Sequence, residues 1–166
     1  TTIDLRRTLD DECLAIERFV ALLRTERELL VQGEVDQMSD LLQDKGRLSN
    51  QLAQLAEQRS RLLAADGRMP DRQGMAAWFA AHPAETKACA AWTRLRSLTE
   101  EARDLNQMNG ELIRLHLQHT AEALSILGAG APPGLYGPDG QSTSSAKAAS
   151  LIEPETPSTA ESPPMG

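Results

Sequence analysis

Apolar residues recur at steps of three and four near the start of the chain, which is the spacing of one helix face. The pattern predicts a helix over residues 3–31. Gly33 is its natural end, because glycine accepts the left-handed conformation that closes many helices. The apolar positions of this stripe are Leu5, Leu9, Cys13, Ile16, Val20, Leu23 and Leu30.

A second stripe alternates steps of three and four without a slip over three heptads, which is coiled-coil spacing. It predicts a helix over residues 35–65, ended by Asp66 and Gly67 and followed by Pro70. Two of its positions are basic rather than apolar. The stripe consists of Met38, Leu41, Lys45, Leu48, Leu52, Leu55, Arg59 and Leu62.

Residues 71–82 predict a short connector helix around Trp78 and Phe79. A third long helix is expected over residues 84–127, opened by Pro83 or Ala84, since proline fits the first helical turn. Its stripe holds polar as well as apolar residues: Trp92, Leu95, Leu98, Ala102, Leu105, Asn109, Leu112 and His116.

Helices of these lengths extend about 42 to 66 Å and cannot form a compact globule of short elements. We therefore expect an all-α fold, an elongated antiparallel bundle of three long helices packed as in coiled coils, occupying residues 1–128. Periodicity stops after Gly128, and seven of the nine prolines follow it. Residues 129–166 are predicted to form a disordered tail, because they hold too few apolar residues to offset the entropy of ordering.

Composition narrows the function classes. Only 3% of the 166 residues are aromatic, which argues against an all-β fold. The formal charge of −7 disfavours binding to nucleic acid or to an anionic membrane surface. No apolar run approaches the roughly 18 residues of a membrane span, so no stable membrane insertion is expected. Cys13 and Cys89 form no disulfide pattern, which is typical of the reducing cytoplasm.

Catalytic and metal chemistry find little support in the residue pattern. His116 and His119 are three positions apart on a helix, but they lack the Glu-x-x-His spacing of carboxylate-bridged sites. Lys45 and Arg59 could line a pocket for a small dianion in a helical-bundle enzyme. More often the aliphatic part of such a side chain packs along the interface between the helices, and its charged group lies at the edge of that interface. We expect no catalytic residue, no metal and no cofactor.

Partner binding is the class that the pattern favours. Long amphipathic helices that satisfy one another incompletely offer an apolar groove to a partner helix. Asn106 and Asn109 lie on or beside the stripe of the third helix, and buried amides favour register and partner choice over bulk stability. Tyr136 lies in the segment Leu-Tyr-Gly-Pro-Asp-Gly, which predicts a turn with the tyrosine ring exposed. An ordinary intramolecular core is the alternative interpretation of the same stripe.

Three segments resemble a known family. They are the helix–Gly–helix passage from Leu29 through Gly33 and Lys45 to Arg59, the element Leu-Asn-Gln-Met-Asn-Gly-Glu-Leu-Ile at residues 105–113, and Tyr-Gly-Pro-Asp-Gly-Gln at residues 136–141. In combination they resemble the FlgN family of flagellar type III export chaperones. The resemblance does not extend to residues 142–166.

This resemblance implies a cytoplasmic chaperone without catalytic activity or cofactor. It would bind the terminal helical regions of the hook–filament junction proteins FlgK and FlgL and deliver them to the flagellar export apparatus. In the family, the end of the last helix and the segment after it are tied to substrate binding. Carried over to this chain, the predicted substrate-binding residues are Asn106, Asn109, Ile113, Leu124, Leu127 and Tyr136.

Two other classes stay open at this point. A self-assembling structural coiled-coil subunit predicts a stable oligomer at low concentration, and a homodimer is compatible with the chaperone interpretation as well. A small-molecule enzyme requires an enclosed pocket lined by Lys45, Arg59 or their neighbours.

Overall fold

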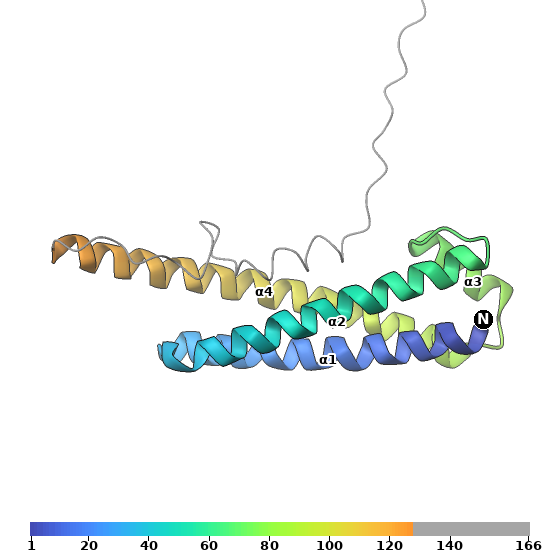
Figure 1. The fold of residues 1–166 in the computed structure, drawn as a ribbon, viewed down its shortest axis with the longest axis horizontal. Coiled ribbons are helices and arrows are strands. Elements are labelled where there is room, and N and C mark those ends of the chain that lie inside the picture. Colours follow the sequence, from blue (N-terminus) through green and yellow to red (C-terminus); the bar gives the residue numbers. More distant parts are fainter. Residues whose placement is uncertain (128–166) are drawn as a thin grey trace, which may run out of the picture.

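A computed structural model describes residues 1–127 of the chain as a bundle of long helices (Figure 1). The described residues contain no strand, and the all-α bundle predicted from the sequence is confirmed. In chain order the elements are α1 (Thr2–Gln32), the 3-10 turn η1 (Val35–Gln37), α2 (Met38–Ala65), α3 (Arg72–Ala81) and α4 (Thr86–Ile126).

The long helices α1 and α4 run in the same direction, with α2 antiparallel to both (Figure 1). Contacts between α1 and α4 show this, because their residue numbers rise together along the bundle. Arg6 meets Glu85 near one end, and the Leu30 carbonyl meets His116 near the other. The short helix α3 crosses the end where α2 finishes and α4 begins, and so returns the chain to its starting end.

The turn between α1 and α2 has a Schellman-type geometry at the predicted glycine. Gly33 adopts φ 74°, and its N–H and that of Glu34 donate to the carbonyls of Leu30 and Leu29 at 3.3 and 3.0 Å. The chain then forms η1 before α2 begins at Met38, three residues later than the predicted start. The spacing of apolar residues is similar in a 3-10 turn and in an α-helix. It therefore could not show that η1 precedes α2.

The connector after α2 is held by a side-chain cap and a close backbone approach. Asp71 precedes α3, and its carboxylate accepts the N–H of Gly74 at 2.8 Å. A Cβ at Gly74 would lie 1.7 Å from the Met69 carbonyl oxygen, so this position requires glycine. Pro83 and Ala84 then form a turn, and α4 starts at Thr86 rather than at residue 84.

Two clusters of buried apolar side chains form the interior. The larger one, which we call the main core, joins α1, α2, α3 and α4 from the N-terminus of α1 to Leu23 and Leu105. The smaller one, the distal cluster, lies around the α1–α2 turn and consists of Leu29, Leu30, Met38, Leu41 and Ile113. Residues 128–166, including the predicted tail and Tyr136, lie outside the described residues, so the predicted division into domain and tail is not tested.

Candidate partner-binding surface

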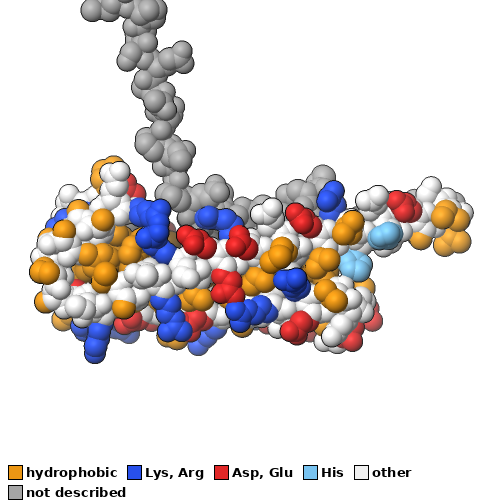
Figure 2. Space-filling model, turned by 180° about the vertical axis from the view of Figure 1, so that it is seen from behind, with side chains coloured by type: hydrophobic (Ala, Val, Ile, Leu, Met, Phe, Trp, Pro, Cys, Tyr) orange, Lys and Arg blue, Asp and Glu red, His pale blue; other side chains and the backbone are white. Residues whose placement is uncertain are grey.

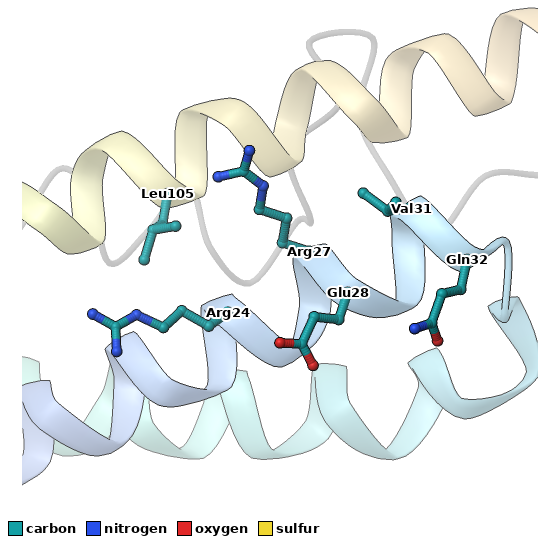
Figure 3. A pocket seen from close by; sticks show the side chains of 6 residues that line it. All are labelled: Arg24, Arg27, Glu28, Val31, Gln32 and Leu105. Carbon is teal, nitrogen blue, oxygen red and sulfur yellow. The ribbon is translucent and has the colours of Figure 1, made fainter.

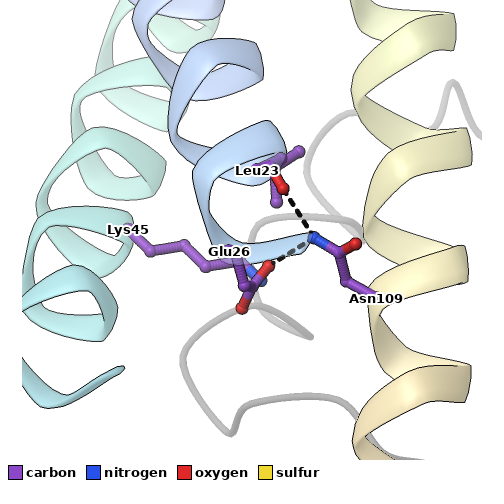
Figure 4. A network of polar contacts seen from close by, with 4 residues as sticks. All are labelled: Leu23, Glu26, Lys45 and Asn109. Carbon is purple, nitrogen blue, oxygen red and sulfur yellow. Dashed lines mark hydrogen bonds and ion pairs between the residues drawn. The ribbon is translucent and has the colours of Figure 1, made fainter. Parts of the chain in front are cut away.

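A buried polar layer separates the main core from the distal cluster and joins the three long helices (Figure 4). Lys45 of α2 donates from Nζ to both carboxylate oxygens of Glu26 of α1 at 3.0 Å. Asn109 of α4 donates from Nδ2 to Glu26 Oε2 and to the Leu23 carbonyl, both at 2.8 Å. All three side chains are buried, and Lys45 is only 2% exposed. One carboxylate therefore receives a donor from each of the two other long helices.

The layer fixes how the helices are aligned along the bundle. Burial lowers the pKa of Lys45, while the neighbouring Glu26 carboxylate works against that shift. A buried ion pair contributes little net stability relative to apolar packing, but separating its partners is costly. Sliding α2 or α4 by one turn would remove one of the two donors to Glu26, so the layer selects one register.

The sequence shows where this layer lies, although the apolar stripes taken one at a time did not predict it. The apolar stripe of α1 passes from Leu23 to Leu30 and skips one heptad position, where Glu26 lies. The stripes of α2 and α4 each hold a polar residue at the same depth, Lys45 and Asn109. The expectation that Lys45 places its charge at the edge of the seam is wrong, because an acidic partner in α1 lets the ammonium remain buried.

A second polar contact crosses the main core nearer the other end of the bundle. Glu12 of α1 is buried, and its Oε2 lies 3.5 Å from Arg59 Nε of α2. The Arg59 guanidinium also lies over the Trp92 ring of α4, 5.0 Å from its centroid. Burial raises the pKa of Glu12 to about 7, although the Arg59 charge opposes this shift.

The structure separates the predicted substrate-binding residues into an interior group and a group at the end of α4. Asn109 and Ile113 are buried, one in the polar layer and one in the distal cluster. Asn106 is half-buried. Leu124 is half-buried and Leu127 is 79% exposed at the end of α4. Tyr136 lies outside the described residues, and the assignment of binding to these six residues stays a prediction.

The C-terminal end of α4 projects beyond the rest of the bundle (Figure 1). His116 Nε2 lies 2.8 Å from the Leu30 carbonyl oxygen, in the last turn of α1. The part of α4 beyond this contact, residues 117–126, has no buried side chain. Leu117 is exposed there and Ile126 is 86% exposed, so this distal arm, which we define as residues 117–127, carries uncovered apolar surface. Figure 2 shows hydrophobic side chains at the projecting end.

A shallow groove of about 440 Å³ runs between α1 and α4 (Figure 3). Arg24 is paired across it with Glu101 of α4. Arg27 extends from α1 toward α4, and its Nη1 lies 3.8 Å from the Met108 sulfur. The residues that line the groove are Arg24, Arg27, Glu28, Val31, Gln32 and Leu105. Sequence reasoning missed this surface because its exposed members lie off the stripes that predict the core.

Other kinds of chemical site find no support among residues 1–127. No group of three or more His, Cys, Asp or Glu in this range is placed to hold a metal ion. A second groove, lined by Phe79, His82 and neighbouring residues, contains neither Lys45 nor Arg59, and neither does the groove of Figure 3. The enzyme alternative required a pocket around those two side chains. Within the described part of the chain, no helix has the length and apolar character needed to span a membrane.

We expect the buried ion pair to show a large cost when only one partner is removed. Lys45→Met leaves the Glu26 carboxylate buried without its cation and should lower the free energy of unfolding by roughly 3–5 kcal/mol. Glu26→Leu combined with Lys45→Met should recover most of that loss. The control Arg24→Met breaks an exposed pair and should cost about 1 kcal/mol or less. Urea denaturation measures all three, and equal losses in Lys45→Met and Arg24→Met would contradict the assignment.

Glu12 predicts a specific pH dependence of stability. Its pKa is about 7 in the folded protein and 4.5 is the ordinary value, so between these pH values the folded state binds more protons than the unfolded state. The contribution of Glu12 is therefore fully present below pH 4.5 and is lost as the pH rises through 7. The free energy of unfolding of the native chain minus that of Glu12→Gln should fall by about 2 kcal/mol between pH 5 and 8. A difference independent of pH would refute the assignment.

Comparison with known proteins gives a consistent result. The profile of the FlgN protein family matches residues 1–144. The chain is 30% identical over 154 residues to the flagella synthesis protein FlgN of Proteus mirabilis, covering 90% of this chain and 97% of that protein. It is 26% identical over 139 residues to the FlgN of Salmonella typhimurium, covering 84% and 90%.

A FlgN of Yersinia enterocolitica is 41% identical over 61 residues, which are 37% of this chain and 39% of that protein. No solved structure matches the chain significantly. The resemblance drawn from the three sequence segments is confirmed, and the chain belongs to the FlgN family.

Proposed function

We propose that this chain is an export chaperone in flagellum assembly. It binds the terminal helical regions of the hook–filament junction proteins FlgK and FlgL and delivers them to the type III export apparatus. Membership of the FlgN family supports the flagellar part of this proposal, and so do the curated relatives named flagella synthesis protein. The protein acts in the cytoplasm by binding alone, with no catalytic step and no cofactor.

The single observation that carries the binding part is the distal arm of α4. Adjacent exposed apolar side chains that form one patch indicate an interaction site, whereas single exposed ones are common on any surface. Ile126 and Leu127 are among the most exposed apolar side chains in the described part of the chain, and they adjoin the half-buried Leu124. An amphipathic helix of a substrate can lay its apolar face against such a surface.

The buried members of the predicted set act differently from the exposed ones. Asn109 is held by Glu26 and Leu23 inside the bundle, so it positions α4 rather than touching a partner in this conformation. Ile113 packs in the distal cluster and anchors the base of the arm. Leu124, Leu127 and Tyr136 are the members of the set proposed to contact the substrate directly.

Self-assembly is a second candidate that the same apolar surface favours. Two copies could bury their distal arms against each other, which would give a homodimer without any substrate. Light scattering on the free protein across a concentration series distinguishes the two. A chaperone binds its substrate in a defined 1:1 or 2:2 complex, whereas a structural subunit forms a stable oligomer by itself.

Substitutions on the distal arm test the proposed surface. Ile126→Ser with Leu127→Ser should weaken binding of the purified FlgK terminal helical region by about tenfold or more, since each buried side chain contributes about 1.5 kcal/mol or more. The matched control is Ile3→Ser with Leu14→Ser, which removes two exposed apolar side chains from α1. Isothermal titration calorimetry measures the affinity, and circular dichroism checks the fold. Native affinity in the arm variant, or equal weakening in the control, would exclude this surface.

The contribution of the residues after α4 is tested separately. A chain ending at Gly130 should bind the FlgK and FlgL terminal regions more weakly than the full chain, because it lacks Tyr136 and the residues around it. If the shortened chain binds as tightly as the full one, the segment after α4 makes no contact with the substrate.

A further inference from the structure

Apolar side chains lie in the groove between α1 and α4 and on the adjoining face of α4. On α4, Leu105, Met108 and Leu115 are spaced by three and seven residues and so share one face of the helix. Leu105 lines the groove and is buried. Met108, which Arg27 of the groove contacts, and Leu115 further along the same face are exposed. Val31 of α1 closes the other side and is 68% exposed. Such a row suits a ligand with adjacent apolar side chains.

The charged side chains that line the groove restrict which ligand charges are compatible with it. Arg27 forms no ion pair with a described carboxylate, and its guanidinium reaches over the groove to Met108. Arg24 is already paired with Glu101. Glu28 also lines the groove and would repel a ligand that is acidic throughout. The best complement is therefore an apolar pair followed by one or two carboxylates that can reach Arg27.

The chain itself contains such a sequence beyond the residues that the family profile matches. Residues 151–155 read Leu-Ile-Glu-Pro-Glu, and no Lys or Arg follows Lys147. Leu151 and Ile152 are the only adjacent pair of large aliphatic residues after residue 127. Pro154 favours an extended backbone at Glu153, which suits a shallow groove. The family profile ends at residue 144, before this segment begins.

The segment can reach the groove from the end of α4. The 24 steps from residue 127 to residue 151 span at most about 80 Å when fully extended. Returning from residue 127 to the level of Met108 requires about 28 Å along the helix. A tethered segment with this reach has an effective concentration that can approach the millimolar range, so even weak docking is populated.

We propose that residues 151–155 dock onto the α1–α4 groove of the same chain, with Leu151 and Ile152 against the apolar row and Glu153 or Glu155 at Arg27. The extension covers apolar surface that would otherwise be exposed. This docking does not depend on the chaperone function.

Paramagnetic relaxation enhancement in the full chain tests the docking without any substrate. A nitroxide is attached at Ser158→Cys in a chain carrying Cys89→Ser, where the remaining Cys13 is buried. Amide signals around Arg27, Val31 and Met108 should lose intensity, while those of α3 should not. Leu151→Asp with Ile152→Asp should restore the lost intensity. The matched control Ser142→Asp with Ser144→Asp adds the same charge outside the segment and should leave the loss in place.

A charge exchange tests the predicted ion pair. Arg27→Glu should restore the amide intensities, and adding Glu153→Arg with Glu155→Arg should bring the loss back. Arg7→Glu, which reverses an exposed arginine near the N-terminus of α1, should have no effect. Absence of any loss at the groove, or a loss that the Leu151 and Ile152 substitutions do not change, would overturn the proposal. A loss that arises between labelled and unlabelled chains in a mixture would show docking by a second copy and would also overturn it.

Discussion

The Glu26 carboxylate is the constraint on which the arrangement of the three long helices depends. It is buried in α1 and receives one donor from Lys45 of α2 and one from Asn109 of α4. A buried carboxylate tolerates no register that removes its donors, because desolvation of an unpaired charge is far more costly than the loss of an apolar contact. Apolar seams alone would permit shifts by a whole heptad at small cost. The polar layer removes that freedom.

The register set by this layer determines which part of α4 is left uncovered. With Asn109 at the level of Glu26, His116 meets the last turn of α1, and the remaining turns of α4 continue past the α1–α2 turn. The distal cluster is small and holds the base of this arm, while the main core stabilises the opposite end. The uncovered apolar surface is therefore a consequence of the alignment, because longer α1 and α2 helices would have covered it.

The helices themselves could be predicted because each rests on a local signal. Periodic apolar residues, Gly33 and the Asp66–Gly67 stop lie within the segments that they define, and the structure places helices there. The parallel direction of α1 and α4 results from the way the chain passes through α3. That path depends on packing at one end of the bundle, and the apolar stripes do not predict it. Burial of Lys45 depends on Glu26, nineteen residues earlier on another helix, and the gap in the α1 stripe was the only local sign of it.

The candidate surface was predicted only in part for a related physical reason. A stripe residue such as Asn109 attracts attention in a sequence because the stripe repeats, but such repetition is typical of the interior. Ile113, Leu124 and Leu127 entered the predicted set through the family resemblance rather than through the pattern. The exposed residues Arg27 of the groove and Met108 beside it lie off the stripes, and only the relative placement of α1 and α4 brings them into contact.

Hydrogen–deuterium exchange on the native chain with and without the FlgK terminal helical region tests the central claim most directly. The claim is that the register set by Glu26 leaves the end of α4 as the surface that receives a partner. Binding should slow exchange of the amides of residues 117–127, with no change in α3 at the opposite end of the bundle. Protection confined to α3 or to the N-terminal half of α1, with residues 117–127 unchanged, would contradict it.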